Sequence, residues 1–358
     1  MKEQKTILVT GVAGYWGNRL AARLGDEPGF HVIGLDTRPP DPAPACLDFI
    51  QADVRNPLLP DLLRDEGVDT VCHLAFVETA YPQDVAFDLN VLGTTKLLEA
   101  CVEAGVRKVV LKSSTAVYGA RPDNPAFLRE SRTLRGSKRS GIIRDLVEIE
   151  TFCAGFRHRH PDLLLTVLRF ANIVGPTADT PLTRLLANPT APTLLGFDPM
   201  MQIIHEDDVV EALVHAVIHD APGVFNVAAE DAMPLSKIRG LAGKPLLPLP
   251  HLLAYWGPRL PGGRRRAARH WPLEPDYLRY PWVADLSRMR DELGFAPRYT
   301  AEETLREFAE RQRLPPYGGG PATLARDEER LRRTLARRRQ ARAQAAADAP
   351  TEENDHVN

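Results

Sequence analysis

The chain of 358 residues is long enough for two modest domains or one large α/β unit with an appendage. Its 45 Lys and Arg are balanced by 47 Asp and Glu, and the formal net charge of -2 selects neither nucleic acid nor an anionic membrane as a partner. Four cysteines, far apart and outside any CxxC or Cys/His cluster, argue against a zinc site and a disulfide framework. The short polar lead before Thr6 leaves no room for a signal peptide, and no stretch approaches the roughly 20 apolar residues of a membrane span, so we expect a cytoplasmic protein.

Short β-branched runs alternate with longer helical patterns through the first half of the chain. Strands are predicted near Ile7 and over residues 31–35, 70–73, 108–111 and 163–168, and helices from Tyr15 and over 85–104 and 141–157. This alternation predicts βαβ units around a parallel sheet. We therefore expect an α/β protein with a Rossmann-type, doubly wound sheet.

After Asn172 the sequence changes to loops and short elements punctuated by prolines, which predicts a smaller, irregular C-terminal substrate domain. We expect residues 1–171 and 206–228 to form the Rossmann domain, and residues 172–205 and 229–315 the substrate side. Residues 316–358 have the composition of a linker followed by a flexible basic and polar tail. No aromatic residues interleave the arginines of this tail, so we expect no nucleic-acid partner.

A glycine-rich turn stands directly between the first predicted strand and the first predicted helix. Gly11, Gly14 and Gly17 have the GxxGxxG spacing, with Tyr15 and Trp16 in the same turn. Glycines allow a pyrophosphate to approach the N–H groups and the dipole of a helix N-terminus. An ordinary tight turn would explain the glycines alone, so the interpretation depends on the context that follows.

An acidic residue ends the second predicted strand. Asp36, nineteen positions after Gly17, can accept hydrogen bonds from the ribose hydroxyls of an adenine dinucleotide and would repel a 2′-phosphate. We therefore predict NAD as the cofactor and rank NADP below it, although Arg38 could offset the repulsion by folding over the ribose.

Several spaced motifs together resemble the extended short-chain dehydrogenase/reductase family of the NAD-dependent epimerase/dehydratase type. They are Asp53-Val54, residues 73–76, Asn90, and residues 113–119, 168–176, 202–209, 225–228 and 292–297. The resemblance covers about residues 6–313 and implies contacts of Asp53 and Val54 with adenine, and of the segment containing Leu74 and Ala75 with the cofactor. Asn90 then leads the long helix expected next.

The same resemblance implies roles at the reacting end of the site. Thr115 takes the position whose hydroxyl holds the reacting substrate oxygen, and Asn172, Arg184 and His205 are candidate substrate contacts. Arg169 is a further candidate that could equally be structural.

The family's Tyr-x-x-x-Lys pair is missing from the predicted helix that begins near Gly141. Aligning Glu148 and Glu150 with the family pattern puts Ile142 at the tyrosine and Leu146 at the lysine, and neither side chain can exchange a proton. Losing general acid/base help typically costs roughly 10²- to 10⁴-fold in rate. The loss of the ammonium also removes stabilisation of a developing oxyanion.

Two hypotheses follow for the function. In the first, the protein is an atypical enzyme acting on a small molecule, such as a nucleotide-sugar, in which Tyr81, His205 or an ordered water takes the proton. In the second, it is a non-catalytic NAD(H)-binding sensor or scaffold, because the glycine loop and Asp36 are kept while both catalytic side chains are lost.

Two surface interpretations are left open by the sequence. Residues 246–256 are apolar and aromatic and precede Arg264, Arg265 and Arg266, which suits either contact with a lipid surface or, as the simpler reading, a helix covering the core beside a solvated basic turn. The family resemblance also implies a homodimer through the helices that begin near Val85 and Gly141.

Overall fold

The computed structural model describes residues 4–77, 83–137, 141–188, 193–245, 247–250 and 273–313, together with residues 328, 331, 332 and 335. Residues 1–309 form one compact unit, and residues 310–358 form a second. The predicted division between a Rossmann part and a substrate part therefore falls inside the first unit. None of the described helices is both long and apolar enough to cross a membrane.

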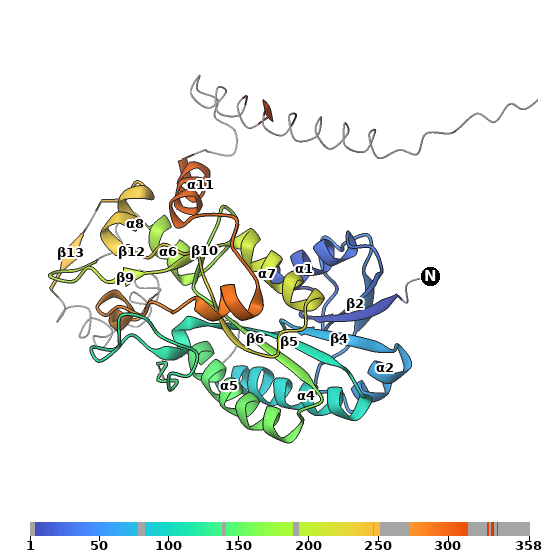
Figure 1. The fold of residues 1–358 in the computed structure, drawn as a ribbon. Helices are drawn as coiled ribbons and strands as arrows, with labels where there is room; N and C mark the ends of the chain where they lie inside the picture. The colour runs from blue at the N-terminus through green and yellow to red at the C-terminus, as the bar shows by residue number, and fades with distance from the viewer. Residues whose placement is uncertain are drawn as a thin grey trace, which may run out of the picture. The chain divides into compact units, whose positions relative to one another are not determined.

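A parallel sheet of seven described strands forms the centre of the first unit (Figure 1). The strands are β1 (Lys5–Thr10), β2 (Phe30–Asp36), β3 (Asp48–Gln51), β4 (Val68–His73), β5 (Lys108–Ser114), β6 (Leu164–Phe170) and β11 (Gly223–Val227). Their spatial order is β11-β6-β5-β4-β1-β2-β3, so the order in which the strands are added reverses between β1 and β4. All six strand pairs are parallel, which confirms the predicted Rossmann-type sheet.

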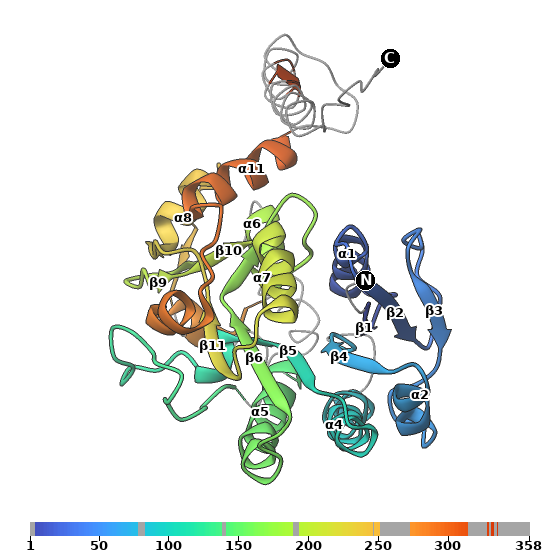
Figure 2. The same cartoon turned by 45° about the vertical axis from the view of Figure 1, so that its right-hand side comes forward.

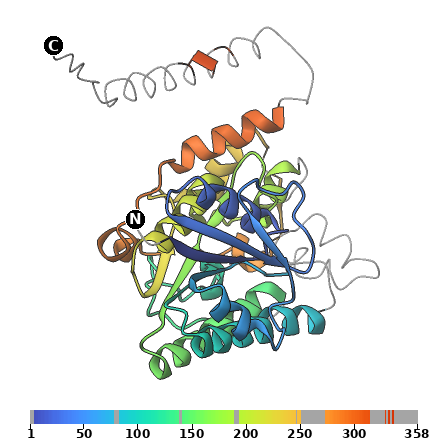
Figure 3. The same cartoon turned by 90° about the vertical axis from the view of Figure 1, so that its right-hand side faces the viewer.

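Helices cover both faces of this sheet, as expected for a doubly wound fold (Figures 2 and 3). The helices are α1 (Tyr15–Gly25), α2 (Leu59–Asp65), α3 (Gln83–Phe87), α4 (Gly93–Ala104), α5 (Gly141–Arg159) and α7 (Glu206–Ile218). Helices α1 and α7 lie on one face, above a core that includes Leu20, Leu24 and Leu213. Helices α2, α4 and α5 lie on the other, above a core that includes Leu97 and Phe156.

Apart from α7 and β11, the described elements beyond β6 are mostly short and share an apolar cluster with residues 116–128 from before β6. These elements are β7 (Asn172–Val174), α6 (Pro181–Ala187), β8 (Thr193–Leu194), β9 (Met200–Met201), β10 (Ile203–His205), β12 (Met233–Pro234), α8 (Leu235–Leu241), β13 (Pro248–Leu249), the 3₁₀ turn η4 (Pro275–Leu278), the π turn η5 (Met289–Leu293) and α11 (Ala301–Arg313). Two-residue and three-residue strand pairs hold these segments together. Residues 251–272 and most of the basic tail lie outside the described residues, so the lipid-surface interpretation stays a prediction.

Three local features differ from the sequence prediction. The edge strand β3 and helix α2 were not predicted, because β3 has only four residues and α2 only seven. The helix predicted over residues 85–104 is interrupted by a π turn, η1 (Asp88–Leu92). That turn carries the fully buried Asn90, and π turns of this kind often mark functional sites.

His73, at the end of β4, is fully buried and should make stability depend on pH. Its ring nitrogens lie 2.7 Å from Thr10 Oγ1 and 3.0 Å from Thr94 Oγ1, and burial lowers the pKa of His73 to about 3. The unfolded chain takes up a proton near the ordinary value of about 6.5, whereas the folded protein does not, so stability falls as pH drops below that value. Between pH 7 and pH 5 we expect a loss of about 2 kcal/mol from this residue.

Urea unfolding of the wild type and of His73→Gln across this pH range measures the effect. The wild type should lose more stability on acidification than His73→Gln. The variant His158→Gln, at an exposed position on α5, should follow the wild type. Parallel curves for wild type and His73→Gln would show that the ring is protonated inside the fold.

Candidate dinucleotide site

The glycine-rich turn is built so that the backbone alone faces the N-terminus of α1. Gly11 has a φ of +77°, which favours glycine, and a Cβ there would lie 2.7 Å from the backbone of Leu74 and Ala75. Gly14 is the N-cap of α1, and its N–H donates to Gly11 O at 3.0 Å. A Cβ on Gly17 would overlap Gly11 O and the backbone of Val12. The turn is therefore packed tightly where glycine is needed, and the first turn of α1 offers its unpaired N–H groups to an anion.

Asp36, which the sequence predicts to bind a ribose, is hydrogen-bonded to the glycine turn. Its Oδ2 accepts a hydrogen bond from the Ala13 N–H at 3.0 Å, and its Oδ1 accepts from the Arg38 N–H at 3.2 Å. The carboxylate is half-buried and keeps further lone pairs for a ligand. The Arg38 side chain is exposed, and none of the described ion pairs involves it. A negative charge therefore stands at the end of β2.

Asp53 and Val54 follow β3 at the same edge of the sheet. Asp53 forms two side-chain hydrogen bonds with Arg55, at 2.9 and 2.7 Å, and this pairing holds the pKa of the Asp53 carboxyl below its usual range. Val54 is buried beneath it. The ionised Asp53 can accept a hydrogen bond from an amino group, as the predicted adenine contact requires.

The segment after β4 is held in place by Asn90 and α5. Leu74 N–H donates to Thr10 Oγ1 at 3.2 Å, and Asn90 bonds both the N–H and the carbonyl of Val77 with its side-chain amide, at 2.8 and 3.0 Å. Asn90 Nδ2 also donates to Asp145 Oδ2 at 2.9 Å. Asn90 therefore positions the strand end that carries Leu74 and Ala75, and its buried amide does not itself reach a surface that a cofactor could touch.

Two hydroxyls lie at the carboxyl end of β5. Thr115 is 1 % exposed and begins the 3₁₀ turn η2 (Thr115–Tyr118), whereas the preceding Ser114 is half-buried and its Oγ accepts from the Ala116 N–H at 3.2 Å. Ser114 is the more accessible of the two, although only Thr115 was predicted from the sequence. Ser114 is therefore better placed than the predicted Thr115 to hold a substrate oxygen.

The two positions predicted to correspond to the family's tyrosine and lysine, Ile142 and Leu146, lie on the first turns of α5. Ile142 is half-buried, and Leu146 is buried at 7 % exposure. Between them the fully buried Asp145 pairs with the Arg144 guanidinium, at 3.0 and 2.7 Å, and with Asn90. The first turns of α5 thus carry two apolar side chains and a carboxylate that is paired with a guanidinium.

Arg169 is fully engaged inside the fold. Its guanidinium pairs with Glu150, bonds Tyr118 Oη at 2.7 Å and the Glu130 carbonyl at 3.2 Å, and its side chain is only 5 % exposed. Burial alone would lower the pKa of Arg169, but the Glu150 carboxylate and the Tyr118 hydroxyl raise it. These contacts favour a structural role for Arg169 over the alternative role as a substrate contact, which the sequence had left open.

The three candidate substrate contacts are placed very differently. Asn172 is half-buried, two residues beyond the Ser114–Phe170 pair of β5 and β6, and donates to the Gln202 carbonyl at 2.9 Å. Arg184 is exposed and pairs with Asp179 at 2.6 and 2.8 Å.

His205 is 1 % exposed. It stacks on Tyr299 and accepts from the Asp207 N–H at the start of α7. The structure therefore gives His205 a capping role and leaves no surface of its ring for a substrate. Tyr81 lies outside the described residues.

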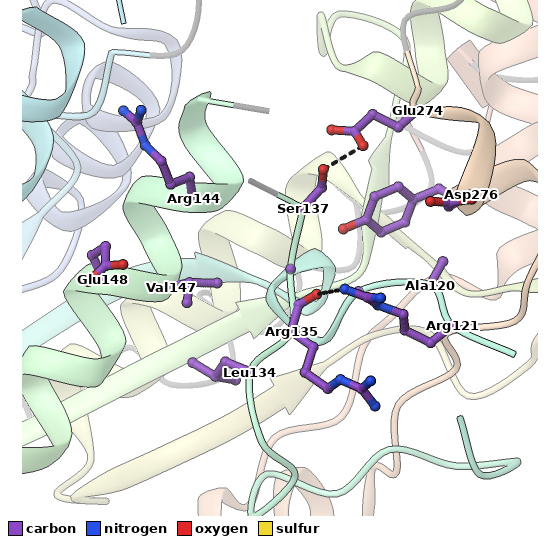
Figure 4. Close-up of a pocket in the computed structure, with 13 residues that line it drawn as sticks. Ala120, Arg121, Leu134, Arg135, Ser137, Arg144, Val147, Glu148, Glu274 and Asp276 are labelled. Atoms are coloured by element: carbon purple, nitrogen blue, oxygen red, sulfur yellow. Dashed lines mark hydrogen bonds between the residues drawn. The ribbon is translucent and has the colours of Figure 1, made fainter. Parts of the chain in front are cut away.

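A cavity of about 690 Å³ opens beside α5 (Figure 4). It is lined by residues 119–121, 134–137, 274, 276 and 277 and by Arg144, Val147 and Glu148 of α5. The buried face of α5 carries Leu146, Ile149 and Cys153, so the cavity adjoins the opposite face of the helix. This cavity therefore does not adjoin the face of α5 that carries Leu146.

The fold and the glycine turn define a Rossmann-type dinucleotide-binding protein. The family model of the NAD dependent epimerase/dehydratase family matches residues 7–228. An uncharacterized protein of Mycobacterium bovis, Mb0513, is 35% identical over 325 residues, which are 87% of this chain and 85% of that protein. The chain therefore belongs to the NAD-dependent epimerase/dehydratase family, within the extended short-chain dehydrogenases/reductases.

Named relatives in this family are more distant. UDP-glucose 4-epimerase of Azospirillum brasilense is 28% identical over 323 residues, covering 82% of this chain and 87% of that enzyme. The structure of MoeE5 in complex with UDP-glucose and NAD is similar with a TM-score of 0.64 and 26% identity, over 86% of this chain and 98% of that one. UDP-glucose 4-epimerase of Thermotoga maritima, with UDP-glucose, gives a TM-score of 0.66 at 22% identity, over 86% and 98%, and shares the fold.

Proposed function

We propose that the protein binds NAD(H) and acts on a nucleotide-sugar or a related hydroxylated small molecule, without a tyrosine–lysine pair. The observation that carries the proposal is the backbone cradle formed by Gly11, Gly14 and Gly17, which Asp36 holds through the Ala13 N–H. NAD supplies hydride exchange when bound. MoeE5 and the Azospirillum epimerase support the substrate class through the sugar nucleotides in their names.

We assign each part of the cofactor and the substrate to particular residues of the chain. The N–H groups at the start of α1 bind the pyrophosphate, Asp36 binds the adenosine ribose, and Asp53 binds adenine. Ser114 or Thr115 orients a substrate hydroxyl, and Asn172 contacts the substrate from the neighbouring strand end. Because Ile142 and Leu146 exchange no proton, a bound water or a group outside the described residues must take it.

Calorimetric titration with NAD⁺ and NADP⁺ tests the cofactor half of the proposal. The wild type should prefer NAD⁺, since the Asp36 carboxylate repels a 2′-phosphate. Asp36→Asn keeps an acceptor for the Ala13 N–H and removes the charge. It should therefore reduce the ratio of the NAD⁺ affinity to the NADP⁺ affinity by roughly 10-fold. Asp162→Asn, at an exposed position in the turn before β6, is the matched control and should leave NAD⁺ binding unchanged. Absence of binding to either dinucleotide would disprove the proposal.

A second candidate function is a non-catalytic NAD(H) sensor or scaffold, which the apolar Ile142 and Leu146 favour. A screen of UDP-sugars for epimerisation and for NADH formation separates the two. Turnover that falls in Ser114→Ala or Thr115→Ala supports the enzyme. Tight NAD⁺ binding without turnover, together with activity gained in the double variant Ile142→Tyr, Leu146→Lys, supports the sensor.

A further inference from the structure

Lys112 places an ammonium group at the edge of the sheet where the dinucleotide is proposed to bind. It lies on β5, one residue beyond the Leu111–His73 pair of β5 and β4, and therefore beside the strand end that carries Leu74. Its Nζ lies 5.5 Å from the centroid of the Trp16 ring, in the first turn of α1. A lysine in the interior of a parallel sheet is unusual, because such strands are apolar on both faces.

The side chain of Lys112 points to the face of the sheet that carries α1. Alternate residues of a strand point to opposite faces, and Ser113 points to α5, where its Oγ donates to Glu150. Lys112 and Ser114 therefore share the other face. Trp16, a residue of the glycine turn, meets Lys112 there. The ammonium therefore lies against the first turn of α1, on the same face of the sheet as Ser114.

We propose that Lys112, supported by the face of Trp16, is a cation that binds the phosphate and ribose segment of the dinucleotide. The inference rests on the proposed NAD(H) site. The Lys112 side chain supplies a positive charge from β5. The family pattern predicts such a charge on α5 at position 146, where this chain has Leu146. The Trp16 ring restricts the ammonium through a cation–π contact, and the backbone of the same residue lies in the phosphate-binding turn. Lys112 is thus a positioning residue for the cofactor.

Calorimetry with four probes, NAD⁺, NADH, ADP-ribose and AMP, tests this assignment. Lys112→Met should weaken binding of NAD⁺, NADH and ADP-ribose by roughly 10-fold, because each contains the pyrophosphate and the second ribose, and should leave AMP unchanged. Lys112→Arg should restore most of the affinity. Lys237→Met, which removes an exposed lysine from α8, is the matched control and should bind like the wild type.

A second neutral variant and a fluorescence measurement allow the assignment to be tested even if Lys112→Met does not fold. Lys112→Gln provides a second neutral side chain in case the methionine variant unfolds. Binding of ADP-ribose should change the tryptophan fluorescence of the wild type, and this change should be absent from Trp16→Phe.

Equal affinities of wild type and both neutral variants for all probes would overturn the inference while leaving the NAD(H) site intact. An equal loss for AMP would also overturn it, since the lysine would then act through the fold. A wild type that binds none of the four probes would overturn the proposed function itself.

Discussion

Gly17→Ala is expected to bind NAD⁺ about 100-fold more weakly than the wild type. The added Cβ would overlap Gly11 O and the backbone of Val12, so the turn and the N-terminus of α1 must move apart. Overpacking of this kind costs roughly 1–3 kcal/mol, and a shift of about 2.7 kcal/mol in binding corresponds to the 100-fold loss. Calorimetry measures the affinity, and urea unfolding measures how much of the strain reduces stability instead.

The matched control for this variant is Gly155→Ala on the exposed face of α5. No atom lies within 4 Å of a Cβ at this position, and the residue is helical. Alanine there should raise stability by up to about 1 kcal/mol and leave NAD⁺ binding unchanged. If Gly17→Ala also bound NAD⁺ like the wild type, the close approach within the glycine turn would not be what shapes the site.

Arg169→Met is expected to reduce the free energy of unfolding by about 3–5 kcal/mol. The substitution leaves the Glu150 carboxylate 2 % exposed and without its cation, and leaves Tyr118 Oη without one of its two partners. Since small domains are typically stable by only about 5–15 kcal/mol, much of the stability would be lost. Urea unfolding at neutral pH gives the value.

Two comparisons separate the ion pair from simple loss of volume. The double variant Glu150→Leu, Arg169→Met removes both charges and should recover part of the stability, because no buried charge is left unpaired. Arg306→Met removes an exposed partner of Glu302 on α11 and should cost less than about 1 kcal/mol. A similarly small cost for Arg169→Met would mean that water reaches the guanidinium, and would revive Arg169 as a candidate substrate contact.

The glycine turn and Asp36 could be predicted because they are local features. A strand, three glycines at fixed spacing and a helix occupy adjacent positions in the chain, and the acidic residue ends the next strand. The elements that escaped prediction, β3 and α2, are too short to show a periodic pattern. The interruption of the long helix at Asn90 could not be predicted either, because the apolar pattern runs through it and the one glycine beside it, Gly93, is itself helical.

By itself the sequence determined the parallel sheet and the glycine turn between its first strand and first helix, since each depends on residue types at fixed spacing. Only the tertiary structure decided how distant side chains are used. It paired Arg169 with Glu150, placed His205 as a cap under Tyr299, and brought Lys112 to Trp16. The physical reason is that hydrogen bonds and ion pairs depend on distances of a few ångströms, which are set by strand order and helix packing rather than by separation along the chain.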